Sequence, residues 1–148
     1  LKYAPVLGWF GLRIGCICVE RGKRTQAIKS MVAAVNSGNS PAGQLIIYPQ
    51  GTRIAPGASA PYKIGTAVLY QETGQTCIPA ATNVGVFWPK YGILRQPGLA
   101  VIEFLPAIQP GLSNELFMHR LEEVIEQSSN ALLEEAATDG FYPVGQDT

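Results

Sequence analysis

The pattern of apolar positions along the chain predicts a domain that combines strands and helices. Residues 45–48 are a short apolar run, typical of a buried strand, and Pro49 should end that strand because it has no N–H to donate. Similar runs predict strands at 16–20, 77–83 and 99–108, and helical spacing predicts helices at 1–15, 23–36, 66–73 and 113–137. Because a helix separates the first two strands, we expect them to pair in parallel. We therefore predict an α/β fold, with a mostly parallel sheet flanked by helices, formed by residues 1–148 as a single domain.

The helices differ in how much of their surface is apolar. The helix at 113–137 is amphipathic, with Ser113 as its N-cap and Glu115 in its first turn. Its predicted buried stripe consists of Leu116, Phe117, Leu121, Val124, Ile125 and Leu132, and its Glu-rich face should be solvated. The segment 1–15 is apolar nearly all round, so it belongs either in the core or at a membrane interface.

The residues that follow the strand at 45–48 carry the main candidate chemistry. Gly51 allows a sharp turn or a close approach to a ligand, Thr52 offers a hydroxyl, and Arg53 offers a planar guanidinium suited to phosphate or carboxylate. Ligands of open α/β sheets bind beyond the carboxyl ends of the strands, so these residues indicate an anion site. The alternative is a surface turn whose arginine pairs with a nearby glutamate.

Charge is distributed unevenly along the chain, although its formal net charge is +0. Residues 1–99 hold ten Lys and Arg against two Glu, a net charge of +8, whereas residues 100–148 hold one Arg against nine acids, a net charge of −8. The basic part contains the anion motif, which favours a phosphorylated substrate or an anionic membrane surface. Alternatively, the two parts interleave in space and their charges cancel. The basic residues are dispersed and match no nucleic-acid motif, so we expect no nucleic-acid partner.

The cysteines, the apolar runs and the first residue indicate the environment of the protein and the extent of the chain. Three cysteines, at 16, 18 and 77, form no disulfide framework, which indicates a reducing environment, and the Cys16-Ile17-Cys18 pair has no histidine nearby that would suggest zinc. We expect neither a metal nor a cofactor. The sequence contains no signal peptide and no apolar run of about 18 residues. It begins with Leu1, so we expect a fragment of a longer protein.

The turn resembles a motif of a known enzyme family. Tyr48-Pro49-Gln50-Gly51-Thr52-Arg53 is similar to the F-P-E-G-T-R block of glycerolipid acyltransferases, above all the 1-acyl-glycerol-3-phosphate (lysophosphatidic acid) acyltransferases. In that family the block binds the phosphate of the acyl acceptor, a role that the resemblance gives to Gly51, Thr52 and Arg53. Position 50 departs from the family, because Gln keeps the length and an acceptor oxygen of the usual Glu but loses its charge.

Two further stretches support the resemblance and add candidate contacts. Residues 15–21 resemble the family's G-x-x-F-I-x-R block, with Cys18 where Phe is usual, and this makes Arg21 a second phosphate or glycerol contact. The alternative is that Arg21 is a surface residue at a helix start. Lys63, two residues before Gly65, either helps to hold the anion or simply begins the next helix.

Two stretches further along bear on the acyl chain and the lipid surface. Residues 77–83 look like the family's V-P-V-A-x-N block, which helps to shape the acyl pocket. In the following Gly- and Pro-rich loop, Phe87 and Trp88 together with Lys90 and Arg95 could touch lipid headgroups or the acyl donor. Alternatively, this loop is simply packed.

The resemblance implies an activity and a location. It implies transfer of a fatty acyl group from acyl-CoA or acyl carrier protein to the free hydroxyl of lysophosphatidic acid, which gives phosphatidic acid in phospholipid biosynthesis. It also implies the cytoplasmic side of a membrane, with peripheral attachment or an anchor upstream. Two alternatives remain: a superfamily member that acts on another lysolipid or glycerol-3-phosphate, and a non-catalytic anion- or membrane-binding module.

The family's catalytic signature, H-x-x-x-x-D, is not found in these 148 residues. His119 is the only histidine, and Val124 stands five positions after it, so we expect His119 to be a helix surface residue. We therefore assign no catalytic residue. We predict that the chain is the C-terminal portion of an acyltransferase, that the signature lies upstream of Leu1, and that the 148-residue chain alone is inactive.

Overall fold

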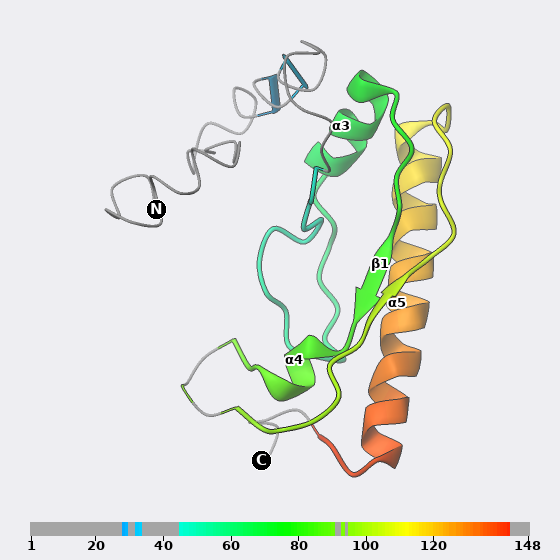
Figure 1. The fold of residues 1–148 in the computed structure, drawn as a ribbon. Helices are drawn as coiled ribbons and strands as arrows, with labels where there is room; N and C mark the ends of the chain where they lie inside the picture. Colours follow the sequence, from blue (N-terminus) through cyan, green and yellow to red (C-terminus); the bar gives the residue numbers. More distant parts are fainter. Residues whose placement is uncertain (1–27, 30–31, 34–44, 91–92, 94, 143–148) are drawn as a thin grey trace.

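The computed structural model describes residues 28–29, 32–33, 45–90, 93 and 95–142 of the chain. Its elements are α3 (Gly65–Thr73), β1 (Ala80–Thr82), α4 (Val84–Phe87), β2 (Ile102–Phe104) and α5 (Asn114–Thr138). Helix α5 runs beside β1 along the molecule, with α3 against its first turns and α4 near its other end (Figure 1). Residues 28, 29, 32 and 33 are helical, in agreement with the helix predicted at 23–36.

Helices α3 and α5 form where the sequence predicts them, because their ends are encoded locally. The Ser113 hydroxyl accepts a hydrogen bond from the Leu116 N–H at 3.3 Å and so caps the start of α5. Gly74 ends α3 in the left-handed conformation, with its N–H donating to the Tyr70 carbonyl. The helices predicted at 66–73 and 113–137 are confirmed, and each predicted end agrees with the structure to within one residue.

The core lies between α3, α5 and the chain that leads into α5. Tyr70 stacks on Phe117, with ring centroids 3.9 Å apart and an angle of 7° between the ring planes. The Tyr70 hydroxyl donates to the Gln109 carbonyl at 2.5 Å and accepts from the Leu112 N–H at 3.2 Å, which holds the 109–112 segment against α3. The buried cluster is Ala67, Tyr70, Ile108, Phe117 and Leu121.

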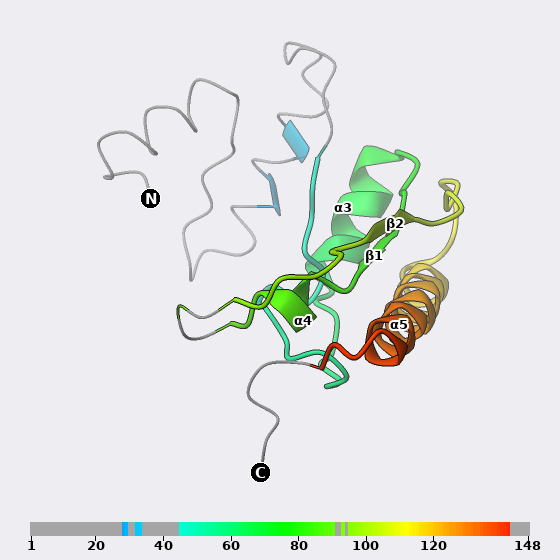
Figure 2. The same cartoon turned by 60° about the horizontal axis from the view of Figure 1, so that its bottom comes forward.

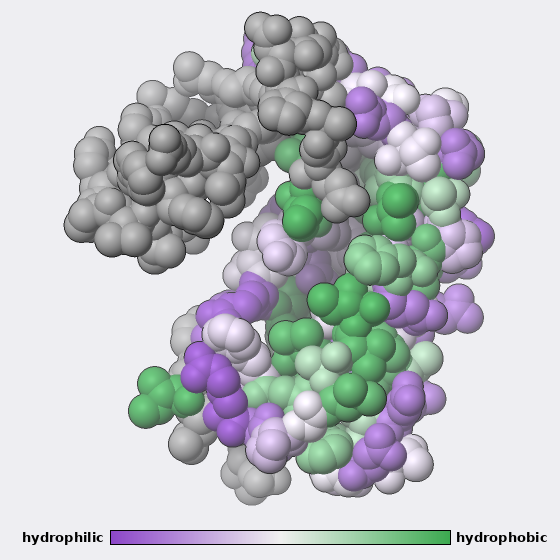
Figure 3. Space-filling view, in the orientation of Figure 1, coloured by the Kyte–Doolittle hydropathy of each residue, from purple (hydrophilic) through white to green (hydrophobic). Residues whose placement is uncertain are grey.

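Strands β1 and β2 form an antiparallel pair, with Ala81 opposite Glu103, and a single bridge between Cys77 and Ile108 extends the ladder. Ala81 is buried on the face that α5 covers, whereas Ile102 and Phe104 are exposed on the other face. In Figure 2, α5 lies on one side of the β1–β2 pair. Hydrophobic side chains gather along the middle of the face shown in Figure 3. The strands predicted at 77–83 and 99–108 are thus confirmed in a shorter form.

The buried strand predicted at 45–48 is wrong for this structure. The segment has no strand conformation, and Ile46 and Tyr48 are 75% and 79% exposed. A strand needs a neighbour to take up its N–H and C=O groups, and the partner predicted at 16–20 lies outside the described residues. In the part of the chain that the structure describes, the only sheet is therefore the two-stranded antiparallel one.

Other local predictions were also corrected. The loop after Asn83 contains the short helix α4, which the sequence pattern did not indicate. Leu116, placed in the buried stripe of α5, is 62% exposed, while its neighbour Phe117 is fully buried. His119 is exposed on α5, as predicted.

Candidate functional site: an exposed turn with basic side chains

The candidate anion site is a tight turn at the end of the 45–48 segment. The Gly51 N–H donates to the Tyr48 carbonyl at 2.9 Å, which closes a four-residue turn with Pro49 in its second position. Gly51 has a φ of +70°, a conformation that glycine adopts without steric cost. The turn predicted from this glycine is therefore confirmed.

Lys63 lies against this turn. Its backbone N–H donates to the Pro49 carbonyl at 2.7 Å, and its Cγ would lie 3.6 Å from a Cβ placed on Gly51. A larger residue at position 51 would thus contact the Lys63 side chain as well as strain the backbone. The structure therefore brings Lys63 and Gly51 together, as an anion site requires, and it also places Lys63 two residues before α3.

Arg53 extends along the surface from the turn. Its Nη2 donates to the Lys90 carbonyl at 2.9 Å, and the side chain is exposed. Its hydrogen-bond partner in the described part of the chain is thus a carbonyl rather than the glutamate of the alternative interpretation. A guanidinium carries five N–H donors, so one hydrogen bond leaves others available to an anion. Gly51 and Thr52 are exposed beside it. Arg21, the remaining predicted contact, lies outside the described residues.

A carboxylate that the amphipathic pattern assigned to a solvated face reaches this turn from α5. Glu126 is half-buried, and its Oε1 accepts a hydrogen bond from the Tyr62 hydroxyl at 2.9 Å and lies 3.5 Å from Gln50 Nε2. Burial and the Glu126 carboxylate raise the pKa of Tyr62, so this phenol stays protonated and donates. No local sequence signal indicates this contact, because 76 residues separate positions 50 and 126.

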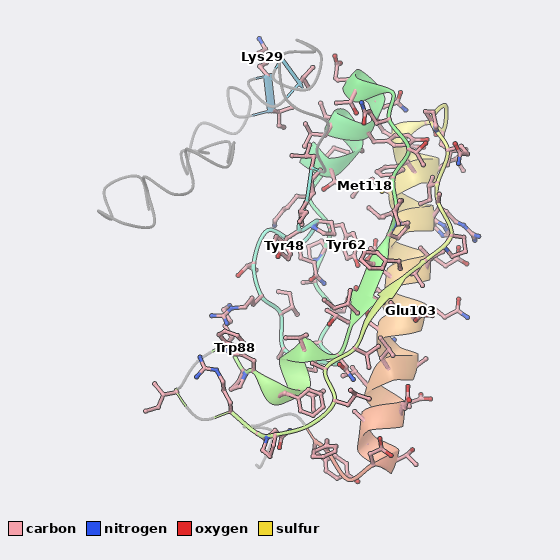
Figure 4. All side chains as sticks on the ribbon, viewed as in Figure 1. Lys29, Tyr48, Tyr62, Trp88, Glu103 and Met118 are labelled. Carbon is pink, nitrogen blue, oxygen red and sulfur yellow. The ribbon has the colours of Figure 1, made fainter. Side chains whose placement is uncertain are left out.

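The sequence allows two interpretations of the loop around α4, contact with lipid and internal packing, and the two aromatic residues differ in which one they fit. Phe87 is buried and meets Phe141 edge-on at 5.5 Å, so it is a packing residue. Trp88 is 51% exposed, and the Arg95 guanidinium lies 4.3 Å from its ring centroid. Figure 4 shows Trp88 at the α4 end of the molecule. An aromatic ring with a cation above it is therefore available at the surface.

Asn83 joins the two segments that flank this loop. Its Oδ1 accepts from the Val101 N–H at 2.8 Å, and its Nδ2 donates to the Leu99 carbonyl at 3.3 Å. The Asn83 side chain is buried. Because Thr82 and Ile102 are the last paired residues of β1 and β2, these hydrogen bonds continue the contact between the two segments beyond the end of the ladder. The last residue of the V-P-V-A-x-N-like stretch therefore has a structural role.

Neither metal chemistry nor thiol chemistry is indicated among the described residues. They contain no group of three His, Cys, Asp or Glu side chains placed to hold a metal ion. Burial raises the pKa of the Cys77 thiol, which makes it a poor nucleophile at neutral pH. The described helices also include none that is long and apolar enough to cross a bilayer.

Comparison with known proteins identifies the family. The family model described as Acyltransferase matches residues 1–83, more than half of the chain, and this stretch includes the whole turn. The chain belongs to the acyltransferase family. The resemblance drawn from the turn is therefore confirmed at the level of the family.

Two curated relatives share similarity with this acyltransferase-family chain. A 1-acyl-sn-glycerol-3-phosphate acyltransferase of Pseudomonas aeruginosa is 29% identical over 108 residues, which is 73% of this chain and 42% of the relative. A protein of the same name from Saccharomyces cerevisiae is 26% identical over 152 residues, which is 100% of this chain and 49% of the relative. The chain thus spans less than half the length of these curated relatives. No solved structure matches it.

Proposed function

We propose that the complete protein transfers a fatty acyl group from acyl-CoA or acyl carrier protein to the free hydroxyl of 1-acyl-glycerol-3-phosphate. The observation that carries this proposal is the exposed turn that presents Gly51, Thr52 and Arg53 within the stretch matched by the family model. Two relatives named 1-acyl-sn-glycerol-3-phosphate acyltransferase support the choice of acceptor. The product is phosphatidic acid, an intermediate of phospholipid biosynthesis.

In this proposal the residues of the turn bind and orient the acceptor. The Arg53 guanidinium holds the phosphate oxygens through parallel N–H donors, and Lys63, whose side chain lies against Gly51, contributes a second positive charge. The Thr52 hydroxyl donates to a remaining phosphate oxygen. Fixing the phosphate positions the acceptor hydroxyl for attack on the acyl thioester. We assign the proton transfer to no residue of 1–148.

The proposal is tested by expressing the complete open reading frame that contains this chain. Acyl transfer is measured with acyl-CoA and with acyl carrier protein as donors, and with lysophosphatidic acid, other lysolipids and glycerol-3-phosphate as acceptors. We expect transfer to lysophosphatidic acid, and no turnover by the 148-residue chain expressed alone. Preference for another acceptor would replace the proposed substrate. Absence of transfer to every acceptor would favour a non-catalytic module.

We further propose that the protein works at the cytoplasmic side of a membrane. The support is the surface beside α4, where exposed Trp88 stacks with Arg95 and Ile93 is 87% exposed. Apolar and aromatic side chains next to cations suit the boundary between headgroups and acyl chains. The activity should therefore sediment with membranes, and recovery in the soluble fraction would contradict this location.

We also infer that the complete protein forms the mostly parallel sheet predicted from the strand–helix–strand order. The support is the apolar segment 45–48, which is exposed here, together with Ile102 and Phe104 on the open face of the β1–β2 pair. Both are surfaces that further strands or helices would cover. A structure of the complete protein in which 45–48 pairs with no strand would contradict this inference.

A further inference from the structure

In the described part of the chain, the Glu126 carboxylate of α5 contacts the segments around the anion turn through its side chain. Its Oε1 faces the Tyr62 hydroxyl at 2.9 Å and the Gln50 amide nitrogen at 3.5 Å. Tyr62 immediately precedes Lys63, whose N–H holds the Pro49 carbonyl, and Gln50 is part of the turn itself. Figure 4 labels Tyr62 and Tyr48 on these neighbouring segments. A single carboxylate therefore meets two donors from the two segments that build the site.

The chemistry of this contact constrains position 50. A carboxylate oxygen only accepts hydrogen bonds, so its neighbours must donate. The Gln50 amide supplies N–H donors, whereas a glutamate at this position would place a second negative charge about as close to Glu126 as the amide is now. Two carboxylates at such a distance repel each other unless one takes up a proton. This accounts for an uncharged residue at position 50, where the resembling block has Glu.

We propose that Glu126 is a positioning residue for the Tyr48–Arg53 turn and that it requires an uncharged hydrogen-bond donor at position 50. The inference rests on the proposed function, because the turn matters only if it binds an anion. Glu126 lies beyond residue 83, where the match to the family model ends. The positioning contact thus comes from a part of the chain that the family model does not cover.

The test uses the complete protein and four variants: Gln50→Glu, Glu126→Gln, the double variant Gln50→Glu/Glu126→Gln, and Glu134→Gln as a control. Glu134 is exposed on the same helix, so its variant removes the same charge away from the turn. We expect Gln50→Glu to raise the apparent KM for lysophosphatidic acid about tenfold with a smaller change in kcat, because like charges at this spacing displace the turn.

The double variant should recover most of the loss, since it exchanges the amide and the carboxylate between the two positions. The amide now on α5 can donate to the carboxylate now in the turn and still accept from Tyr62.

The pH profile separates charge repulsion from a general structural defect. Among the described residues, Tyr62 donates to Glu126, and Glu122, one turn earlier on α5, also acts on Tyr62. Lys63 follows Tyr62 in the chain. In Gln50→Glu the two close carboxylates raise the pKa of one of them, so lowering the pH protonates one and restores a donor. The KM defect of Gln50→Glu should therefore shrink as the pH falls, while the control keeps the profile of the unmodified protein.

Two results would overturn the proposal. In the first, Gln50→Glu behaves like the Glu134→Gln control. In the second, the double variant is as impaired as Gln50→Glu alone. The melting temperatures of the unmodified protein, the two single variants at positions 50 and 126 and the double variant form a cycle that needs no acyl-transfer assay, and coupling between the two positions should also be visible there. If the protein shows coupled melting but no acyl transfer, the proposed function fails while the contact stands.

Discussion

Replacing Arg53 with alanine should raise the apparent KM for lysophosphatidic acid roughly tenfold to a hundredfold in the complete protein. Arg53 is exposed and follows Gly51 and Thr52 in the turn, and one nitrogen of its guanidinium donates to the Lys90 carbonyl. Loss of a hydrogen bond between charged groups costs about 1.5–3 kcal/mol, and each 1.4 kcal/mol or so is a factor of ten in affinity. Steady-state kinetics at varied acceptor concentration measures the effect.

Two variants show whether the effect belongs to the guanidinium at this place. Arg53→Lys keeps the charge but loses the planar pair of donors, so it should fall between Arg53→Ala and the unmodified protein. Arg120→Ala removes a guanidinium that pairs with Glu123 on the surface of α5, and it should leave the KM unchanged. An Arg53→Ala enzyme with the same acceptor KM as Arg120→Ala would remove Arg53 from the site.

Replacing Phe117 with alanine should lower the free energy of unfolding by about 3–5 kcal/mol, the usual cost of removing a buried aromatic ring. Phe117 is fully buried, stacks on Tyr70 and lies in the cluster that joins α3 to α5. The loss leaves a cavity and removes the ring that orients Tyr70. Chemical denaturation monitored by circular dichroism measures the change.

Leu116 offers a control one residue away on the same helix. Its side chain is 62% exposed, so Leu116→Ala should change stability by no more than about 0.5 kcal/mol. The sequence pattern places both residues in the buried stripe, whereas the structure buries only Phe117. Equal losses for the two variants would show that the sequence pattern describes the helix better than the structure does.

The ends of the helices could be predicted because they depend on neighbouring residues. Ser113 caps α5 through the N–H of Leu116, three positions later, and Gly74 ends α3 through the carbonyl of Tyr70, four positions earlier. Such signals are contained within about one turn of helix and need no information about the rest of the fold. The side of α5 that faces the core is harder to predict, because it depends on where α3 and β1 lie.

The strands were less predictable because their formation depends on distant partners. The apolar run at 45–48 has the composition of a strand, but its predicted neighbour lies outside the described residues and its side chains are exposed. The strand predicted at 99–108 narrows to β2, since only Ile102, Glu103 and Phe104 find strand partners in β1. Pairing between segments about 20 residues apart is set by tertiary structure rather than by local composition.

In the candidate site, too, local features could be predicted from the sequence, whereas contacts between distant segments could not. Gly51 and its turn could be predicted from the residue types, since a positive φ and a tight turn are local properties. The position of Lys63 at the turn follows from a backbone hydrogen bond to Pro49 that no spacing rule indicates. The amphipathic pattern places Glu126 on a solvated face, because such spacing does not reveal that Tyr62 from another segment packs against that face.

The hydroxyl of Tyr62 has a consequence for alkaline denaturation. Burial and the neighbouring Glu126 raise the pKa of Tyr62 in the folded protein, whereas in the unfolded chain this phenol ionises near its ordinary value of about 10. The folded state therefore keeps a proton that the unfolded state releases, so the stabilisation is complete below pH ~10 and declines as the pH rises further. Once Tyr62 ionises in strong base, its phenolate can no longer donate to the Glu126 carboxylate, so the contact between Tyr62 and α5 is lost.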